Sequence, residues 1–88
     1  MEIIGKIVEF TPEESGTSSK GDWRRRQVII KTLDQNPTTV AFTAMGIRLD
    51  EANKHTLNEV VRIRFVVSSR KVNDRWFNDI QLWEIKEV

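Results

Sequence analysis

Residues 60–83 read VVRIRFVVSSRKVNDRWFNDIQLW, and this stretch decides the fold. Apolar and polar residues alternate on both sides of Asn73-Asp74, a pattern typical of two strands joined by a tight turn. A type I′ turn needs positive φ at both central residues, and Asn and Asp tolerate that conformation better than most residues other than Gly. The pattern therefore predicts a hairpin with strands at 60–70 and 75–85.

The predicted turn sets the register of this hairpin, because the residue numbers of every cross-strand pair then sum to 147. Val67 lies opposite Ile80 and Phe65 opposite Leu82, which together with Ile63 make one apolar face that we expect in the core. The opposite face then carries the pairs Arg70–Phe77, Arg64–Trp83 and Arg62–Ile85, beside Val66 and Gln81.

The second face of the hairpin is unusual for an exposed strand surface, because it mixes arginines with large apolar side chains. Three interpretations remain open: cross-strand packing of arginine on aromatic rings, a contact between subunits, or a platform on which bases stack. The candidate residues for a contact between subunits are Arg64, Val66, Trp83 and Ile85.

The rest of the chain completes a small all-β architecture. Residues 3–10, 23–32 and 38–45 read as three further strands, and 47–55 reads as a helix of about two turns. Gly5 is a place where a bulge or a sharp bend could interrupt the first strand. Three strands, a short helix and a hairpin, in this order, predict one OB-fold domain over residues 1–88, a five-stranded Greek-key barrel with the helix between the third and fourth strands.

The segment before and within the second strand, SGTSSKGDWRRRQVIIK at 15–31, is the second informative stretch. Residues 11–21 are small and polar, which predicts a mobile loop. If Val28 points into the barrel, Arg24 and Arg26 share its parity, and burying two unpaired guanidinium groups is prohibitive. We therefore expect the strand to run beyond the barrel rim, or to bulge, so that these arginines are free to reach a ligand.

Charge is distributed unevenly along the chain. Lys and Arg number 14 against 13 Asp and Glu, a net charge of +1, yet residues 20–31 alone carry +4 and the remainder −3. A basic segment with aromatic residues of like parity, such as Trp23 and Arg25, suits phosphate contact and base stacking. The candidate nucleic-acid-binding residues are Lys20, Trp23, Arg24, Arg25, Arg26, Lys31, Arg70, Lys71, Arg75, Trp76 and Phe77.

Composition argues against other classes of function. The chain has no Cys and a single His, so disulfides, thiol chemistry and Cys/His metal sites are not expected. His55 has no nucleophile at a recognisable spacing, and Asp79 and Glu84 fall on opposite faces of their strand, so we expect no catalysis, cofactor or metal. No apolar run approaches the roughly 20 residues of a membrane span, and we expect a cytoplasmic protein.

Several segments, among them GKIVEF at 5–10, VAFTAMG at 40–46 and RWFNDIQLW at 75–83, resemble a family of short, single-domain bacterial OB-fold proteins of unassigned function. This family is related to single-stranded DNA-binding protein (SSB), and the likeness covers nearly the whole chain. The resemblance implies an OB barrel and favours DNA over RNA as the ligand. Residues Thr39, Met45 and Val72 stand where SSB carries stacking aromatics, so stacking would have to use the aromatic residues Trp23, Trp76, Phe77 or Trp83.

These observations lead to two hypotheses about function. The first is a non-catalytic protein that binds single-stranded nucleic acid through arginine and lysine contacts to phosphates and through stacking. The alternative is an oligomeric protein–protein interaction module built on the same barrel. The two are compatible, and we expect a homo-oligomer.

Overall fold

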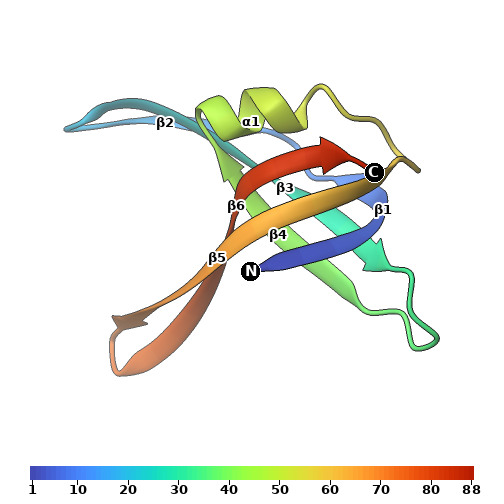
Figure 1. Cartoon of the computed structure of the whole chain (residues 1–88). Coiled ribbons are helices and arrows are strands. Elements are labelled where there is room, and N and C mark those ends of the chain that lie inside the picture. Colours follow the sequence, from blue (N-terminus) through green and yellow to red (C-terminus); the bar gives the residue numbers. More distant parts are fainter.

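Six strands and one short helix make up the chain in the computed structural model, which describes all 88 residues (Figure 1). The elements are β1 (Glu2–Phe10), β2 (Glu14–Ser18), β3 (Gly21–Thr32), β4 (Thr39–Met45), α1 (Ile47–Ala52), β5 (Val60–Val72) and β6 (Arg75–Glu87). The six residues of α1 are too few to span a membrane.

The strands form a closed ring. Their order is β1-β5-β6-β4-β3-β2, and β1 also pairs with β3, which joins the two ends of the barrel sheet. All pairings are antiparallel except that of β4 with β6, which is parallel and joins Thr43 to Gln81. This connectivity is that of an OB barrel, so the predicted all-β fold with a helix before the final hairpin is confirmed.

Strand β2 is an addition to the predicted five strands, and the expectation of a loop over 11–21 is wrong for this part. Residues 14–18 pair with residues 21–25 of β3 beyond the barrel. Polar contacts close this ribbon: the Ser18 hydroxyl donates to the Gly21 carbonyl, and Thr17 donates to Asp22. Small polar residues therefore form a strand here because β3 extends far enough to pair with them.

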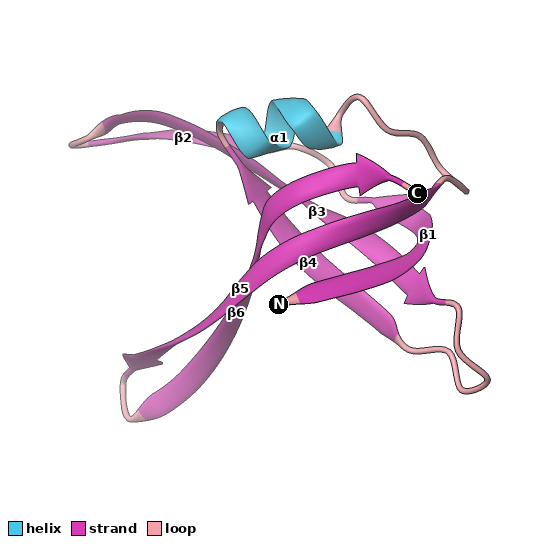
Figure 2. Ribbon diagram, in the orientation of Figure 1, coloured by secondary structure: helices cyan, strands magenta, loops and turns pink.

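The core is built from alternate residues of the barrel strands and from one side of α1. Eleven apolar side chains are buried: Ile7, Val28, Ile30, Phe42, Ala44, Leu49, Ala52, Val61, Ile63, Leu82 and Ile85. Burial of apolar surface is the main source of stability for such a domain. Leu49 and Ala52 of α1 are among these buried side chains, because α1 covers one end of the barrel (Figure 2).

The β5–β6 hairpin confirms most of the predicted register. Asn73 and Asp74 have φ values of 49° and 65°, as a type I′ turn requires. The pairs from Val72–Arg75 to Phe65–Leu82 are those expected.

Beyond Phe65, a β-bulge shifts the register, and Arg64 pairs with Glu84. The predicted pairs Arg64–Trp83 and Arg62–Ile85 are therefore wrong. A bulge adds one unpaired residue to a strand, here on β6, and reverses the side-chain alternation beyond it. Ile85 consequently lies opposite Ile63 and is only 5% exposed, so it belongs to the core and not to an outer contact surface.

A glycine is needed at position 5 of β1 because the neighbouring strand β3 approaches it closely. It pairs with Val61 of β5 on one side and with Thr32 of β3 on the other. A Cβ at this position would lie 2.7 Å from the Lys31 carbonyl oxygen. The bulge of β1 falls between Ile7 and Glu9, so the expected bulge or bend at Gly5 is replaced by tight packing against β3.

Two ribbons project from the barrel toward the same side in Figure 1. The first, which we call the β2–β3 arm, comprises residues 14–25, and the second, the β5–β6 arm, comprises residues 66–81. None of the residues in either arm is buried. The arms are thus two-stranded extensions that frame the outer surface of β3 and β4.

Candidate functional site

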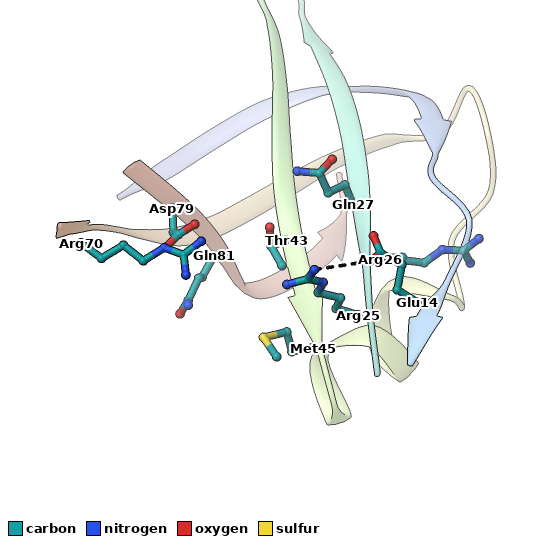
Figure 3. A pocket seen from close by; sticks show the side chains of 9 residues that line it. All are labelled: Glu14, Arg25, Arg26, Gln27, Thr43, Met45, Arg70, Asp79 and Gln81. Carbon is teal, nitrogen blue, oxygen red and sulfur yellow. Dashed lines mark hydrogen bonds and ion pairs between the residues drawn. The ribbon is translucent and has the colours of Figure 1, made fainter. Parts of the chain in front are cut away.

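A groove of about 410 Å³ lies on the outside of the barrel between the two arms (Figure 3). It is lined by Glu14, Arg25, Arg26, Gln27, Thr43, Met45, Arg70, Asp79 and Gln81. These residues come from β2, β3, β4, β5 and β6, so elements from most of the chain length build one surface.

Strand alternation determines which side chains of β3 face this groove. Val28 is buried in the barrel, so Gln27 and Arg25, which have the opposite parity to it, point outward. Across the β3–β4 pairing, Arg25 lies opposite Met45 and Gln27 opposite Thr43. The groove floor therefore changes from charged at the β2–β3 arm to uncharged and polar toward the barrel.

Two arginines approach the groove from its opposite sides. Figure 3 shows the Arg25 side chain extending from β3 and that of Arg70 extending from β5 toward the same space. Each is paired with a carboxylate of its own arm: Arg25 Nη2 lies 3.4 Å from Glu14 Oε2, and Arg70 Nε lies 3.3 Å from Asp79 Oδ2. All four side chains are more than a third exposed, and such pairs contribute at most about 1 kcal/mol. Both guanidinium groups therefore remain accessible to an anionic ligand.

The side chains of Arg24 and Arg26 point to the other side of β3, where they hold α1 and the segment before β2. Arg26 borders the groove, but Figure 3 shows its side chain directed away from that space. Arg24 lies 2.8 Å from Asp50 and 3.4 Å from Glu13, and the hydrogen bond to Asp50 raises the pKa of Arg24 above its ordinary value. Arg26 donates from Nε to the Thr11 carbonyl at 2.9 Å and from Nη1 to Asn53 at 2.8 Å.

The strand does run beyond the barrel rim, as predicted, since β3 continues back to Gly21. The guanidinium groups of Arg24 and Arg26 do not point into the groove, although the Arg24 side chain remains 44% exposed, and their contact with a ligand stays a prediction. Their parity directs them toward α1, and polar groups around that helix satisfy them.

Trp23 and Arg25 form the cation–aromatic pair expected from their parity. The Arg25 Cζ atom lies 5.2 Å from the centroid of the Trp23 ring. The ring lies over Gly16, where an added Cβ would come within 2.5 Å of it. The glycine of β2 thus allows the indole to lie flat along the β2–β3 arm, beside the groove.

The aromatic residues of the β5–β6 arm lie on different faces. Phe77 is opposite Arg70 and shares the face of β6 that carries Asp79, with 44% of its surface exposed. Trp76 is opposite Lys71 on the other face and is 68% exposed. Of these candidates, Arg70 and Phe77 therefore point to the groove side, while Lys71 and Trp76 point away from it.

The remaining basic candidates lie outside the groove. Lys20 is in the turn at the tip of the β2–β3 arm, and Arg75 stands at the tip of the β5–β6 arm. Lys31 lies near the opposite end of β3, next to Lys6 and Thr39. The structure thus gathers only part of the predicted set around one surface.

The four candidate residues for a contact between subunits lie in different parts of the structure. Arg64 and Val66 are exposed on the outer wall of the barrel and on the β5–β6 arm, respectively. Trp83, 55% exposed, is stacked with Arg48 of α1, whose Cζ atom lies 3.6 Å from the ring centroid. Ile85 is buried, as described above.

The only histidine is used locally. His55 Nδ1 bonds to the Glu59 carboxylate in the segment that follows α1, and this hydrogen bond lowers the pKa of Glu59 below its ordinary value. No group of three or more His, Asp or Glu side chains is placed so as to hold a metal ion.

Sequence reasoning missed the uncharged part of the groove, namely Gln27, Thr43 and Gln81. Gln27 has the same parity as Arg25, and this signal was present in the strand pattern. The parallel pairing of Thr43 with Gln81 joins strands that are separated by α1 and β5, so no local signal indicates it.

Comparisons with known proteins place the chain in a family. Among curated proteins, none matches it. The chain is similar to the crystal structure of a small single-stranded DNA-binding protein from Streptomyces coelicolor, with 13% sequence identity, a TM-score of 0.47, and coverage of 100% of this chain and 92% of that chain. A family model described as a domain of unknown function (DUF3127) matches residues 2–86, which confirms the resemblance to a family of unassigned function. The chain therefore belongs to the DUF3127 family.

Proposed function

We propose that the protein binds a single-stranded nucleic acid, without catalysing a reaction, in the groove between the β2–β3 arm and the β5–β6 arm. The observation that carries this proposal is the approach of Arg25 and Arg70 to one groove from opposite sides (Figure 3). Guanidinium groups bind phosphates through paired, charge-assisted hydrogen bonds. Two of them across a groove suit a ligand with repeating phosphates.

The carboxylates beside these arginines set the expected character of binding. Glu14 and Asp79 pair with the two arginines in exposed positions, so a phosphate can replace either carboxylate at little cost in free energy. The net charge of the chain is only +1, and attraction is therefore local to the groove. We expect moderate affinity that falls steeply with salt, because phosphate binding releases counterions.

The aromatic side chains favour a single strand over a duplex. Trp23 and Phe77 are next to Arg25 and Arg70, respectively, on the same strand faces and just outside the residues that line the groove. Aromatic rings stack on exposed base faces at about 1–3 kcal/mol per base, and a duplex keeps those faces covered. The preference for DNA over RNA rests on the family resemblance, and titrations with both polymers will measure it.

Titration of fluorescent 12-mers of dT and rU at two salt concentrations tests the proposal. The double variant Arg25→Ala/Arg70→Ala is expected to bind at least about tenfold more weakly, because two phosphate contacts are lost. The slope of log affinity against log salt should also decrease by roughly 1.4, at about 0.7 per phosphate contact for a single strand. Arg62→Ala is the matched control, since this exposed arginine pairs with Glu2 outside the groove. Equal affinity and slope for the double variant and the parent would contradict the proposal.

A second candidate function, self-association, is supported by the β5–β6 arm. Val72, Trp76 and Phe77 are exposed on a ribbon of two strands, and such ribbons are marginally stable unless another element packs on them. Exposed apolar groups rimmed by charge often mark contacts between proteins. Light scattering tests self-association. A mass above 10.3 kDa supports it, and a mass of 10.3 kDa at every protein concentration contradicts it.

A further inference from the structure

We infer that the floor of the groove reads the edges of nucleobases through Gln27, Thr43 and Gln81, so that binding discriminates between bases. This inference rests on the proposed function and adds which part of the nucleic acid faces the floor.

The three side chains form one row across the sheet. Gln27 of β3 pairs with Thr43 of β4, and Thr43 pairs with Gln81 of β6. Adjacent strands lie about 4.8 Å apart, so the row spans roughly 10 Å. All three residues line the groove between Arg25 and Arg70 (Figure 3).

The polar groups of this row are available to a ligand. The hydrogen bonds of Gln27 involve its backbone only: its N–H donates to the Thr11 hydroxyl, and its carbonyl accepts from Thr11. The hydrogen bonds made by side chains of this protein include none from the side chains of Gln27, Thr43 or Gln81. Each glutamine amide offers two donors and an acceptor, and the hydroxyl offers one donor and an acceptor.

The charge pattern decides which part of a strand lies where. Arginines occupy the two sides of the groove and the uncharged row occupies its floor, so phosphates belong at the sides and bases over the floor. An amide can bond two adjacent groups of a base edge at once, as Gln does with adenine. Met45 continues the floor beside Arg25 and offers an apolar surface to the face of a base.

A ligand that has phosphates but no bases would use only the sides of the groove. Polyphosphate or an abasic strand can bond Arg25 and Arg70 and leaves the three floor side chains without partners. The inference therefore predicts two separable contributions to binding, one from charge and one from base identity.

The experiment compares four 12-mers of equal charge: dA, dC, dT and an abasic strand. The parent should bind the best homo-oligomer at least about fivefold more tightly than the worst, which is the lower end of what one good base contact provides. In the double variant Gln27→Ala/Gln81→Ala, this ratio should fall below about twofold, while the affinity for the abasic strand stays within a factor of two. Gln35→Ala is the matched control, because Gln35 is exposed in the turn between β3 and β4.

Each outcome has a distinct meaning. Stacking within the free dA strand affects all proteins equally, so the ratio of parent to variant isolates the floor contacts. Equal binding of all bases by the parent, or discrimination that persists in the double variant, overturns the inference and leaves the proposed function in place. Failure to bind any of the four strands overturns both. Both glutamines are exposed, and thermal melting of the variants confirms that they are folded.

Discussion

The barrel body and its two arms differ in what their residues contribute. Eleven apolar side chains are buried in the body, whereas none of the residues in the β2–β3 arm or the β5–β6 arm is buried. Stability therefore comes mainly from the body, and the arms can present charged and aromatic groups with little effect on folding. The groove lies where the two regions meet: Gln27 and Thr43 of its floor belong to the body, and Gln81 is the last residue of the β5–β6 arm.

Arg25, the last residue of the β2–β3 arm, and Arg26, the first residue after that arm, also differ in role. Arg26 points toward α1 and bonds to Thr11 and Asn53, while Arg25 points into the groove. Two residues of the same type, adjacent in sequence, thus differ in role because strand alternation directs them to opposite faces.

Substitution of the body glycine should give the largest loss of stability. In Gly5→Ala, the new Cβ would lie 2.7 Å from a backbone carbonyl of β3, which can yield only if the strands move. We expect the free energy of unfolding to fall by about 2 kcal/mol, as in other overpacked sites. Urea denaturation measures this value.

An arm glycine provides the control for that substitution. In Gly16→Ala, the new Cβ would meet the ring of Trp23, which can swing away from the β2–β3 arm. We expect a loss below about 1 kcal/mol, because Gly16 is only half-buried and the group that its Cβ meets is a side chain. Equal losses for the two variants would contradict the division between body and arms.

The two neighbouring arginines should separate stability from binding. Arg26→Ala removes two hydrogen bonds from a charged donor and should lower the free energy of unfolding by about 1.5–2 kcal/mol. Arg25→Ala should change it by less than about 0.5 kcal/mol and should instead weaken oligonucleotide binding. Denaturation and titration of both variants measure the contrast, and a reversed result would show that Arg25 is the structural residue.

Neutralising the groove carboxylates should give a smaller change, in the opposite direction. The variant Glu14→Gln/Asp79→Asn frees Arg25 and Arg70 from their partners and removes two negative charges from the groove. We expect affinity for a single strand to rise about threefold to tenfold at low salt, since exposed pairs are weak. Glu2→Gln, whose carboxylate pairs with Arg62, is the control and should leave affinity unchanged. Weaker binding by the double variant would mean that the carboxylates hold the arginines in their binding positions.

Much of the fold was predictable because its signals are local. Apolar alternation identified the barrel strands, and Asn73-Asp74 identified the turn, since both depend on residues close together in the chain. Strand β2 was not predictable in this way, because ESGTS at 14–18 has no apolar alternation and becomes a strand only by pairing with the extension of β3. The bulge beyond Phe65, which carries Ile85 into the core, likewise depends on how the barrel closes.

The candidate site was only partly predictable for a related reason. Parity on β3 placed Trp23 with Arg25, but it could not show that α1 would engage Arg24 and Arg26, because Asp50 and Asn53 lie on a different element. The row Gln27–Thr43–Gln81 depends on the parallel contact of β4 with β6, which forms only in the closed barrel.

Mapping of amide chemical shifts by NMR, with a single-stranded 12-mer added to the labelled protein, tests the central claim most directly. The account predicts that the largest shifts fall on Arg25, Gln27, Thr43, Arg70 and Gln81, on the two sides and the floor of one groove. Shifts concentrated on α1 or on the β1–β5 wall around Arg62, with the groove unaffected, would contradict it.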